Sequence, residues 1–295
     1  MTLALLQGFV GNQGDGWSYT VDYLERFLED ALVNPPEALV PETDPHSANL
    51  LMMNTLGRRT GELHQALSKE TGDPAFDPEP VHVKEFNDWN EQLRADVLKT
   101  LELLKRKRDL PEPAQGLAQR VLGAKAPILK RIASLAPRRP SFLKTRHHGD
   151  YHLGQVLIAQ HDFVIIDFEG EPARALAERR RKDSMLRDVA GMLRSFSYAA
   201  YAALQRLSAE RPGDFERMEP HARTWEERAA AAFLEGYDET IAGCPAYPED
   251  PAQARELIEL YTLEKAFYEL RYEMDNRPDW LGIPLEGVLR LIETP

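Results

Sequence analysis

The stretch His148-Gly149-Asp150-Tyr151-His152-Leu153-Gly154-Gln155 decides the fold, together with the segment Phe163-Val164-Ile165-Ile166-Asp167-Phe168-Glu169-Gly170 that follows it. Glycines interrupt the first segment, which predicts a loop. The second segment begins with β-branched and aromatic residues, which predict a short strand, and it ends in an acidic turn. We therefore expect an acid on a loop, an amide five residues later and a second acid after a strand, all on one small β element.

This set of side chains suits phosphoryl transfer, which requires positioning and charge neutralisation more than covalent help. Asp150 could accept the proton of an acceptor hydroxyl, while Gln155 and Asp167 carry the hard oxygen ligands that Mg²⁺ prefers. Glu169 either adds a carboxylate for a second Mg²⁺ or is only a turn residue. Two carboxylates would also suit a glycoside hydrolase, but the amide and the preceding strand favour a phosphotransferase.

Three further segments extend the pattern: Asn-Gln-Gly-Asp-Gly-Trp at 12–17, Asp-Phe-Glu-Gly-Glu-Pro at 167–172 and Tyr-Glu-Leu-Arg-Tyr-Glu at 268–273. Together with the loop above, they resemble the maltokinase family over nearly the whole chain, from about Leu5 to Ile292. That family phosphorylates maltose at the anomeric oxygen and is often linked or fused to trehalose synthase. The resemblance implies ATP and Mg²⁺ as cofactors, maltose as acceptor, and trehalose synthase as a possible partner.

The same resemblance suggests roles for other residues. His148 and Asp188 would anchor the catalytic loop, although Asp188 could instead form a pair within its own helix. Lys265, Tyr268 and Tyr272 share one helix face, and a face of one cation and two phenols suits a sugar better than a core. We therefore expect these three to contact the acceptor, with an ordinary half-exposed helix face as the alternative.

The expected fold is mostly α with a small β insert, which resembles the C-terminal lobe of a kinase-like, aminoglycoside-phosphotransferase-like fold. The N-terminal lobe is expected to be absent, since no Gly-rich phosphate loop or Val-Ala-Ile-Lys strand occurs. A separate chain could supply it. Residues 1–16 would form a hinge strand, over 3–10, and a loop; residues 17–295 would form the helical lobe, with catalytic and metal loops at 147–171.

The start of the chain offers candidates for nucleotide binding. If residues 3–10 form the hinge, Gln7, Phe9 and Asp15 would lie beside the nucleotide. The polar residues at 12–17 could equally well only close a turn. Helices are expected over 17–32, 47–67, 86–106, 115–135, 184–210, 217–243 and 251–276, where Asp250 and Pro251 are a favourable N-cap and first residue.

Composition limits the partners. The 295 residues carry a net charge of −12, which argues against a nucleic-acid surface. No apolar run approaches the length of a membrane span, and a single cysteine fits a reducing, cytoplasmic setting. Two other functions stay open: phosphotransfer to another small hydroxyl acceptor, such as an aminoglycoside or choline, and a non-catalytic module that docks onto trehalose synthase. Aminoglycoside and choline acceptors need acidic pockets, whereas the C-terminal helix offers Lys and Tyr.

Overall fold

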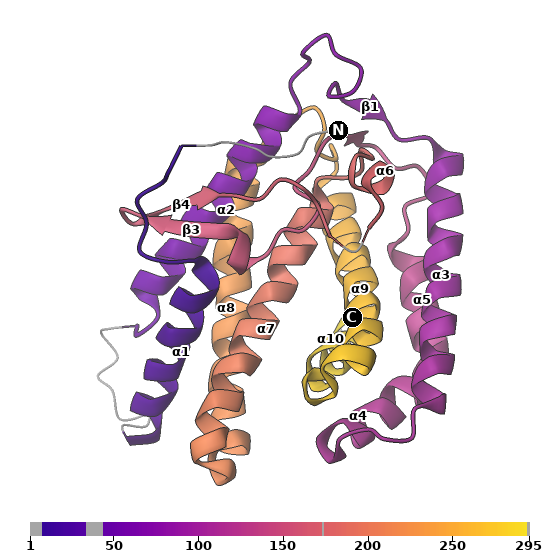
Figure 1. Ribbon diagram of the computed structural model, residues 1–295. Coiled ribbons are helices and arrows are strands. Elements are labelled where there is room, and N and C mark those ends of the chain that lie inside the picture. The colour runs from indigo at the N-terminus through magenta and orange to yellow at the C-terminus, as the bar shows by residue number, and fades with distance from the viewer. Residues whose placement is uncertain (1–7, 34–43, 173, 294–295) are drawn as a thin grey trace.

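The computed structural model describes residues 8–33, 44–172 and 174–293, and it is mostly helical, as expected (Figure 1). The helices are α1 (Gly16–Val33), α2 (Ser47–Leu67), α3 (Val83–Arg106), α4 (Glu112–Gly123), α5 (Lys125–Leu135), α6 (Leu176–Arg179), α7 (Leu186–Glu210), α8 (Phe215–Ile241), α9 (Pro251–Asn276) and α10 (Gly282–Glu293). Two antiparallel pairs supply the β structure: β1 (Glu79–Pro80) with β2 (Leu143–Lys144), and β3 (Val156–Ala159) with β4 (Asp162–Ile165).

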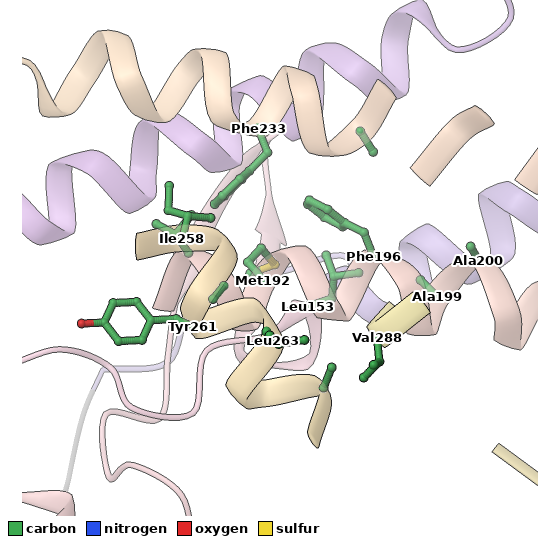
Figure 2. Packing of buried hydrophobic residues seen from close by; sticks show 14 of the residues in the cluster. Leu153, Met192, Phe196, Ala199, Ala200, Phe233, Ile258, Tyr261, Leu263 and Val288 are labelled. Atoms are coloured by element: carbon green, nitrogen blue, oxygen red, sulfur yellow. The ribbon is translucent and has the colours of Figure 1, made fainter. Parts of the chain in front are cut away.

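The main body is built by helices α2, α8, α7 and α9, which pack on one another in that order. Glycines bring α2 and α8 close together: a Cβ on Gly57 would lie 1.9 Å from the Phe233 carbonyl oxygen, and one on Gly236 would lie 2.1 Å from that of Asn54. Any larger residue would push the helices apart. Between α7 and α8, the rings of Phe196 and Phe233 meet edge to face at 5.7 Å (Figure 2).

The β3–β4 hairpin lies beside the start of α1 and crosses the middle of α2 (Figure 1). The loop before α1 holds it there, because the Gln13 N–H donates to the Ile158 carbonyl at 2.8 Å and the Ile158 N–H donates to the Gly14 carbonyl at 2.9 Å. On the other side, Arg59 of α2 pairs with Asp162 at 2.7 Å. The hairpin that carries the acidic turn is therefore fixed to the helical body at both edges.

Three expectations about the elements need correction. The helix expected over 115–135 is two helices, because Pro127 lacks the N–H that would continue the first across Gly123. Helix α10 was not expected. Residues 1–7 lie outside the described part of the chain, and residues 8–10 form no strand, since the pairing with β3 comes from residues 13–15 instead. Helix α9, in contrast, spans the expected residues, and the Asp250 side chain caps it.

Candidate functional site

The loop between β2 and the β3–β4 hairpin takes its shape from one carboxylate. Asp188, in the first turn of α7, accepts the His148 N–H at 2.7 Å and the Gly149 N–H at 2.9 Å. Gly149 has a φ of +81°, which favours glycine. The sequence offered two roles for Asp188, and the structure places it on the backbone of the loop.

Asp188 is itself held by His64 of α2, which in turn contacts Tyr237 of α8. His64 of α2 approaches its carboxylate at 3.2 Å through Nε2, and the other ring nitrogen of His64 lies 3.0 Å from the Tyr237 hydroxyl. Burial opposes the charge of Asp188, but the hydrogen bond with His64 and the nearby His147 and His148 hold the pKa of Asp188 well below its usual range. The carboxylate therefore stays ionised and keeps its backbone bonds.

His148 joins the catalytic loop to the acidic turn. Its Nε2 donates to the Ile166 carbonyl at 2.8 Å, so its Nδ1 is the acceptor for the Asp150 N–H at 3.3 Å. Ile166 immediately precedes Asp167, so a single imidazole sets the backbone of both acids. This is a positioning arrangement, since both ring nitrogens are occupied.

Gln155 and Asp167 are adjacent at the open end of the hairpin. The Gln155 side-chain nitrogen donates to Asp167 Oδ2 at 3.1 Å, and the Ile166 N–H donates to the main-chain carbonyl of Gln155 at 3.0 Å. Asp167 adopts a φ of +63°, an unusual backbone conformation that turns the chain away from β4. Glu169 is exposed two residues later.

These donors fit a magnesium ion, although among the described residues no three His, Cys, Asp or Glu side chains gather as a metal cage. Mg²⁺ typically takes one or two carboxylates from the protein and fills its other positions with water and substrate phosphate. The carboxylate of Asp167 and the side-chain carbonyl oxygen of Gln155 could supply the protein ligands, and Glu169 lies close by in sequence. When bound, the ion would neutralise phosphate charge.

A cleft of about 560 Å³ opens beside Asp150, and a smaller one of about 190 Å³ adjoins it. Asp150, Tyr151, Glu171, Gly191, Lys265 and Tyr268 line both. In the part of the chain that the structure describes, no group donates a hydrogen bond to the Asp150 carboxylate. A hydroxyl entering the cleft would thus meet an acid without a competing partner.

The three residues of α9 that the sequence singled out all line the larger cleft. The Lys265 ammonium lies 5.0 Å from the centre of the Tyr268 ring, and the Tyr268 hydroxyl donates to Glu171. Tyr272 lies further out, is 45% exposed and faces Arg277 at 5.5 Å. Burial and the neighbouring Glu171 raise the pKa of Tyr268, so the phenol keeps its proton.

Carboxylates of the cleft are the feature that sequence reasoning missed. Glu171 pairs with Arg174 at 2.8 Å, Glu269 with Arg194 at 2.8 Å, and Glu273 with Arg277 at 2.6 Å. The spacing held a signal, because residues 265, 269 and 273 are four apart and share a helix face. The described lining of the cleft therefore holds more carboxylates than cations, a balance that Lys265 and the two tyrosines of α9 alone do not indicate.

Two of the three residues proposed to contact the nucleotide lie within the described part of the chain. Gln7 lies outside the described residues, and Phe9 is 93% exposed. Asp15 caps α1: Oδ1 accepts the Ser18 N–H at 2.8 Å and Oδ2 accepts the Ser18 hydroxyl at 3.1 Å. Of the polar residues at 12–17, Trp17 reaches the cleft beside Asp150.

No protein-family model matches the chain. A glucosamine kinase from Streptacidiphilus jiangxiensis is 25% identical over 285 residues, which are 96% of this chain and 56% of that protein. A second, from Mycolicibacterium smegmatis, is 30% identical over 151 residues, half of this chain and 34% of that protein. A solved glucosamine kinase in complex with glucosamine, ADP and inorganic phosphate superposes with a TM-score of 0.71 over 97% of this chain and 59% of its own, at 21% identity.

The chain shares its fold with solved glucosamine kinases. It spans about half the length of the curated relatives it matches. The maltokinase resemblance was wrong in its family, and with it fall maltose as the acceptor and trehalose synthase as the partner, because the relatives are glucosamine kinases. The motifs at the catalytic and metal loops do not distinguish between such acceptors. Within residues 8–33, 44–172 and 174–293, no helix combines the length and apolarity that a membrane span needs.

Proposed function

We propose that this chain carries the acceptor site and the catalytic acids of an ATP- and Mg²⁺-dependent phosphotransferase whose acceptor is a hydroxyl of an amino sugar. The observation that carries the proposal is the position of Asp150. It lines the acidic cleft on one side, and through His148 it is tied to the turn that bears Asp167 on the other. The similarity to glucosamine kinases supports the same reaction.

The chemistry follows from these positions. Asp150 would accept the proton of the attacking hydroxyl, because its carboxylate faces the cleft without another partner. Gln155, Asp167 and Glu169 would hold Mg²⁺, which supplies charge neutralisation on the phosphate oxygens. Lys265 and Tyr268 would hydrogen-bond the sugar hydroxyls and keep the ring in place for attack.

The amine of the sugar is the part of the acceptor that the cleft selects. Its described lining holds four carboxylates, Asp150, Glu171, Glu269 and Glu273, against the cations Lys265 and Arg277. Glu171 is the candidate for the ammonium, since it lies at the junction of the two clefts and is 7% exposed. Its oxygens already accept from the Tyr268 hydroxyl and from Arg174, so the ammonium would bind beside these donors, on the remaining lone pairs of the carboxylate. A charge-assisted hydrogen bond in such a place is stronger than one to a neutral group.

Calorimetry with the 295-residue chain tests the acceptor. We expect glucosamine to bind about tenfold more tightly than glucose, which differs by the amine alone, because a hydrogen bond to a charged group contributes about 1.5–3 kcal/mol. Glu171→Gln should remove most of that preference. Glu178→Gln is the matched control, since Glu178 is exposed on α6 and does not line the larger cleft. Equal affinities for the two sugars in the unsubstituted chain would refute the amino-sugar assignment.

A further inference from the structure

A second cavity, of about 260 Å³, lies between α7, α8 and α10, away from the catalytic loop. Its inner walls are apolar, formed by Leu204, Phe215, Leu234, Ile283 and Leu291 among others. The cavity is open to solvent on one side, where Phe215, Leu234 and Leu291 are partly exposed, while Leu204 and Ile283 are buried. A half-open apolar cavity of these dimensions can hold a small organic molecule.

One end of the cavity carries an excess of carboxylates. Glu219, Glu226 and Glu286 surround the single guanidinium of Arg290, at 4.0, 2.8 and 3.4 Å. Burial and the neighbouring Glu219 and Glu226 raise the pKa of Glu286 against the opposing effects of Arg290 and Arg223. At the rim, Arg223 and Glu227 approach at 3.9 Å and balance each other. The polar end is thus negative, next to walls that favour hydrocarbon.

Helix α7 separates this cavity from the acceptor cleft. Ser195 and Tyr198 line the cleft, whereas Ser197 and Ala200 line the cavity, so opposite faces of one helix serve the two. Arg194 closes the gap between them: its Nε donates to Glu269 at 2.8 Å, and its Nη1 lies 3.4 Å from the Ser197 hydroxyl.

Gly287 of α10 leaves the space that Arg194 occupies, since a Cβ there would lie 2.4 Å from Arg194 Nη1. The ion pair of Arg194 with Glu269 therefore forms a closed wall, and the cavity is a separate chamber rather than an extension of the acceptor cleft.

We propose that this cavity is a second ligand site, which takes a small organic ammonium ion with a compact apolar body. The ammonium group would lie among Glu219, Glu226 and Glu286, and the hydrocarbon would lie against the apolar walls. An anion would be repelled at the polar end, and a neutral molecule would gain only the apolar contacts. This inference does not depend on the proposed function.

The test uses 2-phenylethylammonium as the probe and 2-phenylethanol, its neutral counterpart, as the comparison. Titrations of the 295-residue chain are followed by two-dimensional NMR at low salt. We expect shifts at residues of α7, α8 and α10 that line the cavity, and an affinity for the amine roughly tenfold above that for the alcohol. Equal affinities, or shifts that fall on residues 147–171 and α9 instead, would overturn the proposal.

Two substitutions localise the effect. Glu286→Gln should weaken binding of the amine roughly fivefold and leave binding of the alcohol unchanged, because it removes charge at the polar end. Glu227→Gln is the matched control, since Glu227 is 69% exposed and paired with Arg223 at the rim, and it should change the affinity less than twofold. If both variants lose the same amount, only general surface charge attracts the amine, and the assigned site is wrong.

Discussion

Asp188 and Asp150 lie on two sides of one loop, and their surroundings are opposite. Asp188 is 2% exposed and receives bonds from two backbone amides and an imidazole. Asp150 is partly exposed, and among the described residues its carboxylate receives none. A carboxylate whose oxygens accept from backbone amides fixes the backbone, whereas a carboxylate whose oxygens accept no bond can take up a proton. These surroundings give Asp188 a structural role and support the catalytic role that we propose for Asp150.

The largest effect is expected on kcat, from substitution of Asp150. In any protein that contains this chain and transfers phosphate to glucosamine, Asp150→Asn should lower kcat by about 10²- to 10⁴-fold, the usual contribution of a positioned base. The free energy of unfolding should hardly change, because no described group depends on that carboxylate. Steady-state kinetics and urea unfolding measure the two quantities. A variant with normal kcat would remove Asp150 from the chemistry.

The buried acid should give the opposite result. Asp188→Ala leaves the His148 and Gly149 amides and the His64 imidazole without their acceptor, and loss of one partner from a buried charged network costs about 3–5 kcal/mol. Urea unfolding at neutral pH measures this. Asp22→Ala is the control, because Asp22 is 57% exposed and only 3.7 Å from Arg206, and it should cost less than about 1 kcal/mol. Similar losses in both variants would mean that the anchor contributes little to stability.

The contrast between the two acids also explains what the sequence could and could not predict. Gln155 and Asp167 are brought together by a hairpin of adjacent strands, so their proximity is local and the spacing predicts it. Helix α9 was placed because Asp250 and Pro251 mark its start. The imidazole partner of Asp188, His64, comes from α2, more than a hundred residues away, and is itself held by Tyr237 of α8; no local pattern indicates either residue.

The acceptor was misjudged for a related reason. Glu269 and Glu273 look like ordinary helical charges in sequence, and only the packing of α9 against α7 shows that they line a cleft. The motifs of the catalytic and metal loops report the transferred phosphate, which many kinases share. The residues of α9 that we propose as acceptor contacts lie outside the catalytic and metal loops.

A smaller effect is expected from pH. The folded-state pKa of Asp188 lies below the ordinary value of 3.8, so its ionised form stabilises the fold above that pH, and the contribution is lost as the pH falls below 3.8 toward the folded-state pKa. The difference in unfolding free energy between the unsubstituted chain and Asp188→Asn should therefore be constant from pH 7 to about 5 and shrink at lower pH. Urea unfolding at several pH values checks this. A difference that is unchanged at pH 3 would contradict the lowered pKa.

The smallest effect is expected at a third acid, Asp15. The sequence offered two roles for it, closing a turn and contacting the nucleotide, so it tests the distinction between Asp188 and Asp150 directly. Both oxygens of Asp15 accept hydrogen bonds from Ser18. Like Asp188, Asp15 therefore has no free oxygen, and we expect it to be a structural cap rather than a nucleotide contact. Asp15→Ala should lower the free energy of unfolding by about 1 kcal/mol, and Asp15→Ser, which retains a capping oxygen, should recover most of it. Nucleotide affinity, measured by calorimetry with ATP and Mg²⁺, should be the same in both variants and in the unsubstituted chain. A stable Asp15→Ser variant with clearly weakened ATP binding would instead assign this carboxylate to the nucleotide, and occupied oxygens would then no longer separate structural acids from chemical ones.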